Sequence, residues 1–106
     1  MEKLELFKLG KDIALGKKGT GWMAIGKSDI QEALKTEGKT PEEKFYNWAE
    51  GWKETLQWEH EVGKKLKPMT EETIGERIEQ EDLYFHGYTE GMKEKYNKLK
   101  KLKEVV

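Results

Sequence analysis

The sequence predicts a mainly α protein, built as a single domain over residues 1–106. Apolar residues recur with helical spacing through the second half of the chain, and helix-capping signals precede these stretches. Pro68 separates the two longest stretches and would end the first of them. We therefore expect a Gly-rich N-terminal segment, one short helix, and then a long antiparallel helical hairpin.

The N-terminal segment, residues 1–27, allows two interpretations. Residues 3–9 fit either a short β-strand or a pair of helical turns. Residues 22–25 lie between glycines and fit a short buried strand or an extended segment. The glycines that interrupt the segment are Gly10, Gly16, Gly19, Gly21 and Gly26.

The short helix is expected over residues 28–38. Ser28 and Gln31 form an S-x-x-Q capping box at its start. Gly38 is the residue at which the helix should stop, because glycine readily adopts the left-handed conformation that follows a helix.

The first long helix is expected over residues 40–67. Thr40 fits the N-cap position, Pro41 fits the first helical position, and Glu43 completes a capping box. The apolar residues that follow helical spacing along it are Phe45, Trp48, Ala49, Trp52, Leu56, Val62 and Leu66.

The second long helix is expected over residues 70–104, with Thr70 as its N-cap. Lysines crowd its last turns, where a positive charge interacts favourably with the helix dipole. Because only a short connection joins the two long helices, they should pack antiparallel. The apolar stripe of the second helix comprises Ile74, Ile78, Phe85, Tyr88, Met92, Tyr96 and Leu99.

A ten-residue pattern, F-x-x-[WY]-x-E-G-x-K-E, occurs at residues 45–54 and again at residues 85–94. Chance similarity between two amphipathic helices would produce it. Alternatively, Gly51 and Gly91 lie where another backbone approaches closely, since glycine inside a helix costs about 1 kcal/mol relative to alanine. Gly87 either belongs to the same small-residue face as Gly91 or ends the helix.

Residues 21–28, GWMAIGKS, match the phosphate-binding pattern G-x-x-x-x-G-K-[ST]. A true P-loop follows a buried strand of a parallel sheet, and residues 15–20 predict no such strand. We expect ordinary helix capping here, with a small-molecule site as an alternative. In that site the helix start would bind an anionic or nucleotide-like ligand, and an indole would stack on a base. Its residues would be Lys17, Lys18, Trp22, Lys27 and Ser28.

Charge is unevenly distributed along the chain, although the net charge is -1. Residues 1–40 carry a net charge of +2, residues 41–90 a net charge of -7, and residues 91–106 a net charge of +4. Nineteen lysines accompany a single arginine, the residue that most often recognises phosphates and bases in a bidentate manner. The pattern disfavours nucleic acid as a partner and favours pairing between acidic and basic regions.

Residue content also excludes several classes of site. The chain has no cysteine, which rules out disulfides, thiolate zinc sites and cysteine nucleophiles. No apolar run approaches the roughly 18 residues of a membrane span, and the N-terminus does not resemble a signal peptide. We expect a cytoplasmic protein that makes no membrane contact and requires no cofactor.

Four acidic residues are candidates for a metal site. Glu59 and Glu81 fall within the apolar stripes of the two long helices, and an antiparallel register would bring them within about one helical turn. Glu79 and Asp82 add an E-x-x-D pattern. Because neighbouring carboxylates bind divalent cations, a helical metal-dependent nucleotide hydrolase is an alternative function.

The leading hypothesis is a non-enzymatic protein-interaction protein. Tyr46, Trp58 and Leu83 fall off the apolar stripes, and exposed residues of this size, aromatic ones above all, serve as interface anchors. With Glu50 and Glu54 they would present an aromatic and acidic surface to a macromolecular partner. A hairpin alone cannot shield four tryptophans, so we also expect self-association, most simply as a homodimer. Such a protein could occlude a basic surface of its partner, as a phage or mobile-element inhibitor of a host protein would.

Overall fold

The computed structural model describes residues 3–17, 24–52, 66–68 and 70–101. These residues form four helices and no strand: α1 (Lys3–Ala14), α2 (Lys27–Ala33), α3 (Pro41–Gly51) and α5 (Ile74–Lys101). The mainly α fold class is therefore confirmed for the described part of the chain. None of the described helices is long and apolar enough to cross a membrane.

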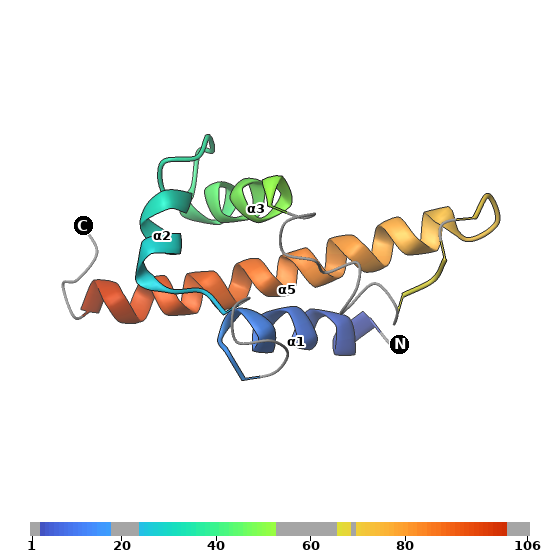
Figure 1. The fold of residues 1–106 in the computed structure, drawn as a ribbon, viewed down its shortest axis with the longest axis horizontal. Coiled ribbons are helices and arrows are strands. Elements are labelled where there is room, and N and C mark those ends of the chain that lie inside the picture. The colour runs from blue at the N-terminus through green and yellow to red at the C-terminus, as the bar shows by residue number, and fades with distance from the viewer. Residues whose placement is uncertain (1–2, 18–23, 53–65, 69, 102–106) are drawn as a thin grey trace.

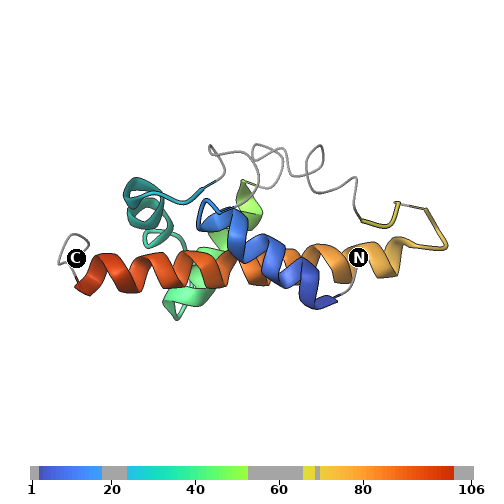
Figure 2. The same cartoon turned by 90° about the horizontal axis from the view of Figure 1, so that it is seen from below.

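Helix α5 is the longest element and lies at the centre of the fold (Figure 1). Two perpendicular views show α1 along one side of α5 and α3 along the opposite side (Figures 1 and 2). Helix α2 crosses near the C-terminal half of α5 and contacts both α3 and α5. The two helices that flank α5 leave a strip of its surface exposed between them, and this strip becomes the floor of the candidate site.

The N-terminal segment forms a helix, and the alternative of a short strand at residues 3–9 is wrong. Leu6, Gly10, Ile13 and Ala14 are the buried residues of α1, and their spacing places them on one face of a helix. In a strand, Leu6 and Ile13 would point to opposite faces, because side chains alternate along it. The helix buries this face against α5, and α1 is the most extensive partner of α5.

The second expected strand, residues 22–25, falls partly outside the described residues. Ala24 and Ile25 belong to neither a helix nor a strand. The Ile25 N–H donates a hydrogen bond to the carbonyl oxygen of Ala14 at 2.8 Å, and the Ile25 side chain is buried. Through this hydrogen bond, the segment that precedes α2 lies beside the end of α1.

The predicted antiparallel hairpin is present in part. Glu42, near the start of α3, pairs with Lys93, while Tyr46 one turn later contacts Asp82 earlier in α5. The two helices therefore run antiparallel. The hairpin prediction omitted α1, which runs parallel to α5 along its other side.

Helix α3 begins as predicted, but its described part is shorter than the expected range of 40–67. The Thr40 side chain accepts a hydrogen bond from the Glu43 N–H at 3.2 Å, and Pro41 is the first helical residue. The Glu43 carboxylate accepts from the N–H of Lys39 at 2.7 Å, so the second bond of the expected capping box goes one residue further back. The helix ends at Gly51.

The rest of the expected first long helix cannot be followed as one helix. Residues 53–65 lie outside the described residues, and residues 66–68 are not helical.

Helix α5 begins at Ile74, four residues after the expected N-cap. The hydroxyl groups of Thr70 and Thr73 hydrogen-bond to each other at 2.7 Å, and the Thr73 hydroxyl donates to the carbonyl oxygen of Pro68 at 2.5 Å. Because the hydroxyls are used in this way, they hold a turn ahead of the helix instead of capping it at Thr70. The helix then continues to Lys101.

Helix α5 is unbroken at Gly87 and packs against α1 through glycines. A Cβ atom at Gly87 would overlap the carbonyl oxygen of Phe7, and one at Gly91 would lie 2.7 Å from the Cβ of Ala14. Gly10 makes the reciprocal approach from α1 to the backbone of α5. The interpretation of Gly87 and Gly91 as one small-residue face is confirmed, and the helix stop at Gly87 is wrong.

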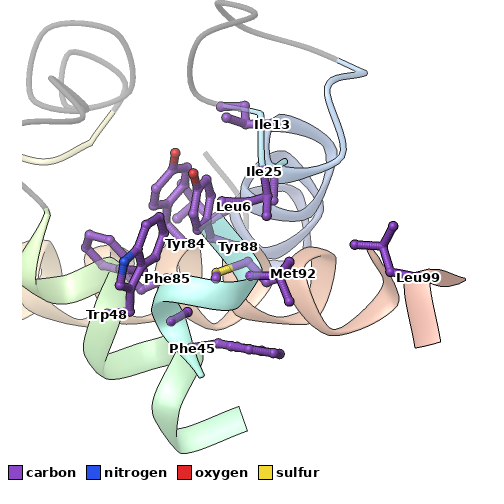
Figure 3. Close-up of a cluster of buried hydrophobic side chains, with 14 of the residues drawn as sticks. Leu6, Ile13, Ile25, Phe45, Trp48, Tyr84, Phe85, Tyr88, Met92 and Leu99 are labelled. Carbon is purple, nitrogen blue, oxygen red and sulfur yellow. The ribbon is translucent and has the colours of Figure 1, made fainter. Parts of the chain in front are cut away.

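The buried hydrophobic residues form one cluster around α5 (Figure 3). The rings of Tyr84 and Tyr88 stack with centroids 6.1 Å apart, and Phe85 meets Tyr84 edge-on at 5.5 Å. Burying a side chain of this size stabilises a fold by about 1.5–3 kcal/mol. Labelled members from the other elements are Leu6, Ile13, Ile25, Phe45 and Trp48.

Candidate functional site

Tyr46 lies at the junction of α3 and the exposed strip of α5. Its hydroxyl donates a hydrogen bond to the Asp82 carboxylate at 2.7 Å. Its ring meets Phe85 edge-on at 6.4 Å and lies 5.0 Å from the ring of His86 at a tilt of 30°. Although the sequence placed Tyr46 off the apolar stripe, it is partly buried and packs against the core cluster.

Burial raises the pKa of the Tyr46 hydroxyl well above its ordinary value, and the hydrogen bond to Asp82 acts in the same direction. Both effects disfavour the phenolate, because it would be poorly hydrated and would face a negative charge. The hydroxyl therefore remains a proton donor at neutral pH and fixes Asp82 beside the ring.

Two concave surfaces meet at Tyr46, and together we call them the Tyr46 groove. The first, with a volume of about 520 Å³, lies between α1 and α3 on the exposed strip of α5. The second, of about 290 Å³, continues along α5 towards its N-terminus. The first is lined by Phe7, Glu42, Glu43, Tyr46, Asn47, His86, Thr89 and Glu90, and the second by Tyr46, Glu50, Gly75, Ile78, Glu79, Glu81, Asp82 and Phe85.

The groove is acidic. Seven of its lining residues are Asp or Glu, and none of the described residues that line it is Lys or Arg. Glu42 and Glu79 pair with lysines at the rim of the groove, Lys93 and Lys3. Because these lysines do not line the groove, negative charge is in excess among its described lining residues.

Glu50 and Glu90 are the carboxylates most open to a new partner. Within the described part of the chain, neither forms an ion pair or a side-chain hydrogen bond. Glu50 is exposed and lines the second concavity, whereas Glu90 is half-buried and lines the first. A cation bound in either half of the groove would therefore find a carboxylate that forms no ion pair with the described residues.

The groove also contains apolar surface. Ile78 is 55% exposed, although the sequence placed it in the apolar stripe of the second long helix. Phe7 of α1 and the ring of Tyr46 form the walls of the first concavity. Combined apolar and acidic surface is suited to basic protein segments, whose lysine and arginine stems are apolar and whose ends are charged.

The structure brings together residues that the sequence assigned to two different sites. Tyr46 and Glu50 were predicted to bind a partner, and Glu79, Glu81 and Asp82 to bind a metal. All five line the second concavity. Sequence analysis missed Phe7, Ile78, His86, Thr89 and Glu90 as site residues, because the position of α1 beside α5 has no local sequence signal.

The predicted metal ligands have separate interactions. Glu79 pairs with Lys3 at 2.5 Å, Glu81 is engaged by the only arginine, and Asp82 accepts the hydroxyl of Tyr46. No group of three or more His, Asp or Glu residues in the described ranges is arranged to hold a metal ion. Glu59 lies outside the described residues, so the hydrolase hypothesis stays a prediction.

Arg77 and Glu81 form a buried ion pair that has a structural role. Both side chains are almost fully buried, and the Arg77 Nε lies 3.2 Å from a carboxylate oxygen of Glu81. The Arg77 Nη1 also donates to the carbonyl oxygen of Lys67 at 3.0 Å, while Gln80 accepts the Lys67 N–H at 2.7 Å. The single arginine therefore ties the segment before α5 to that helix, and Glu81 contributes less free charge to the groove than Glu50 or Glu90.

The remaining partner-binding residues lie elsewhere. Leu83 is partly buried and faces a separate hollow on the α1 side of α5, beside Lys3 and Lys67. Trp58 and Glu54 fall outside the described residues.

The structure describes only some of the candidate residues for an anionic ligand. Lys17 is exposed after the end of α1, and Lys27 and Ser28 are the exposed first two residues of α2. Lys18 and Trp22 lie outside the described residues. The structure therefore places three of the five candidates, and none of these three is among the described residues that line the Tyr46 groove.

The start of α2 differs from the predicted capping box. The N-cap is Gly26, not Ser28, and its N–H donates to the Asp29 carboxylate at 2.9 Å. Asp29 places a negative charge in the first turn, where a bound anion would otherwise interact with the helix dipole. Ser28 and Gln31 are exposed helix residues without a capping role.

The arrangement supports binding of positive charge more directly than it supports catalysis. Its features are a groove with clustered carboxylates, an ordered tyrosine hydroxyl and exposed apolar side chains. No protein-family model, curated protein or solved structure matches the chain. The functional argument therefore depends on the geometry and chemistry of the groove.

Proposed function

We propose that this protein is a non-enzymatic interaction protein that binds a basic segment of a macromolecular partner in the Tyr46 groove. The observation that carries the proposal is the composition of the groove: seven carboxylates, with no Lys or Arg among its described lining residues. Lysine or arginine side chains of a partner would pair with Glu50 and Glu90. These two carboxylates have no ion-pair partner within the described residues.

The apolar part of the groove would supply affinity, while its charge would supply specificity and speed of association. Ile78 and Tyr46 both line the second concavity, together with its carboxylates. A partner that buries the exposed part of Ile78 gains hydrophobic free energy in proportion to the apolar area removed from water. Surface charges alone would give weak, salt-sensitive binding.

Occupation of a partner's basic surface would block that surface to nucleic acid. Acidic protein surfaces compete with the phosphate backbone for the same lysine and arginine side chains. This mode of action supports the hypothesis of an inhibitor, of the kind that a phage or mobile element directs against a host protein. The protein would act by binding and occluding, without chemical change to its partner.

The test is a titration of the protein with a short lysine-rich peptide, in which calorimetry measures the binding affinity. The groove variant carries Glu50→Lys and Glu90→Lys, and the matched control carries Glu32→Lys and Glu37→Lys. Glu32 and Glu37 are exposed residues of α2 and the following turn that line neither concavity. The two variants have the same net charge, so any difference between them depends on where the charge lies.

We expect the groove variant to bind the peptide at least about tenfold more weakly than the wild type, which corresponds to about 1.4 kcal/mol. The control variant should retain most of the affinity, and Ile78→Ser should weaken binding without changing the charge. Equal losses in the groove and control variants would mean that net charge alone drives binding, and would remove the proposal.

A further inference from the structure

Helix α5 carries opposite charges on its two halves. Residues 74–90 hold five carboxylates and one arginine, for a net charge of -4, and residues 91–101 hold five lysines and one glutamate, for a net charge of +4. The helix dipole favours such an order only within the first and last turns. Glu81, Asp82 and Glu90 lie far from either end, so the dipole does not account for the acidic half.

The C-terminal half of α5 has a basic surface that the fold leaves available. We define the basic end as Lys95, Lys98, Lys100 and Lys101. The last three are exposed, and the only ion pair among the four within the described residues joins Lys98 to Glu94 at 4.0 Å. Figure 1 shows this end of α5 projecting beyond both α1 and α3.

We infer that the basic end of a second copy of this chain occupies the Tyr46 groove in a reciprocal, antiparallel dimer. The inference deepens the proposed function and rests on it, because the same groove receives the second copy. It names that copy as one basic partner of the groove. The supporting observation is the charge complementarity between the acidic groove, to which α5 contributes residues, and the basic end of the same helix.

A two-fold symmetry axis would relate the two copies, so that the assembly is a closed dimer. The groove and the basic end lie about 20 Å apart along α5, given the rise of about 1.5 Å per residue of an α-helix. When two α5 helices lie antiparallel, each acidic half faces the basic half of its neighbour. Both contacts then form at once, and the assembly ends at a dimer instead of growing into a chain.

Self-association would regulate access to the groove. A basic segment of another protein and the basic end of a second copy would compete for the same carboxylates. Apparent affinity for a foreign partner should therefore fall as the protein concentration rises, because dimerisation removes free grooves.

The experiment measures the dimer dissociation constant by sedimentation equilibrium at low ionic strength. The groove-reversed variant carries Glu50→Lys and Glu90→Lys, and the end-reversed variant carries Lys98→Glu and Lys101→Glu. Each should raise the dissociation constant at least tenfold, because each replaces attraction by repulsion at two positions of both contacts. The Glu32→Lys, Glu37→Lys control should dimerise as the wild type does, and circular dichroism verifies that every variant keeps its helical content.

Mixing the two reversed variants provides the decisive measurement. The unchanged groove of the end-reversed variant then faces the unchanged basic end of the groove-reversed variant. At the other contact, the lysines introduced by Glu50→Lys and Glu90→Lys meet the glutamates introduced by Lys98→Glu and Lys101→Glu. An equimolar mixture should therefore form a heterodimer with affinity near that of the wild type, and salt should weaken it. A wild type that remains monomeric at every concentration, or a mixture that fails to associate, would overturn the inference.

The outcomes separate this inference from the proposed function. The end-reversed variant keeps the groove intact, so its titration with the lysine-rich peptide tests the groove alone. Peptide binding by a monomeric wild type would overturn self-association and leave the proposed function standing. A charge-controlled dimer that binds no peptide would support self-association and overturn the wider binding function.

Discussion

The two copies of the F-x-x-[WY]-x-E-G-x-K-E pattern lie in α3 and α5 and meet different surroundings. Their first residues, Phe45 and Phe85, are both buried, and so are the aromatic residues at the fourth position, Trp48 and Tyr88. The shared part of the pattern therefore directs one face of each helix into the same core. Residues 53 and 54 of the first copy lie outside the described residues.

The copies differ in the surroundings of the glycine that they share and of the residue that follows it. Gly91 approaches Ala14 of α1, whereas a Cβ at Gly51 would meet nothing within 4 Å. The expectation that Gly51 lies at a close backbone approach is therefore wrong. Position 92 is a fully buried Met in α5, and the corresponding Trp52, which directly follows α3, is 39% exposed.

The third position of the pattern explains the difference. Asn47 of α3 is exposed, and its side chain donates to the carbonyl oxygen of Glu37 at 3.0 Å. The corresponding residue of α5 is Gly87, on which the backbone of α1 rests. An exposed position tolerates a polar side chain here, but a position on which another backbone rests needs a residue without a side chain.

The largest expected effect on stability comes from a substitution that makes the copy of the pattern in α5 resemble the copy in α3. Gly87→Asn places a side chain where the Phe7 carbonyl group lies, so α1 cannot dock as it does now. We expect a loss of about 3 kcal/mol or more in the free energy of unfolding, at the upper end of overpacking effects. Urea unfolding monitored by tryptophan fluorescence would measure it.

The reverse change is the matched control for Gly87→Asn. Asn47→Gly removes an exposed hydrogen bond and adds a glycine to α3, and should cost about 1 kcal/mol or less. Equal losses in both variants would show that α1 does not depend on the glycine face.

A smaller effect on stability is expected from alanine substitutions at Gly51 and Gly91, the equivalent glycines of the two copies. Gly91→Ala brings a methyl group against Ala14 and should destabilise the protein by about 1–2 kcal/mol after the gain in helix propensity is included. Gly51→Ala enters open space at the end of α3 and should be neutral or stabilise by up to about 1 kcal/mol. Thermal unfolding of the two variants would compare them directly, and a stabilising Gly91→Ala would contradict the close packing of α1.

The smallest effect concerns Tyr46, whose counterpart in the second copy is His86. Burial raises the pKa of Tyr46, so the stabilisation that it contributes is fully present below the ordinary pKa of tyrosine, about 10, and is lost as the pH rises above it. Tyr46→Phe should lower stability by about 1 kcal/mol at neutral pH, because the hydrogen bond to Asp82 is lost. It should also make stability fall less steeply with pH above about 10.

Urea unfolding at several pH values would give both effects of Tyr46→Phe. An unchanged pH slope in the variant would show that the ionisation of Tyr46 is not linked to folding.

Local chemistry made several elements predictable from the sequence. The Thr40 cap, with Pro41 at the first helical position, determined where α3 begins, because capping bonds join residues only a few positions apart. Tyr46 and Glu50 were assigned to a partner surface from their position relative to the apolar stripe, and the structure places both in one groove. That assignment stays a prediction until binding is measured.

Tertiary structure decided the features that local patterns do not encode. Tyr46 and Asp82 are separated by 36 residues, and only the antiparallel packing of α3 on α5 joins them. The parallel docking of α1 converts the exposed strip of α5 into a groove. The sequence by itself determined where α3 begins and which residues are acidic, since both depend on residue type and short-range spacing. Which helix lies beside α5 was settled by where backbones can approach each other, and that depends on contacts between distant parts of the chain.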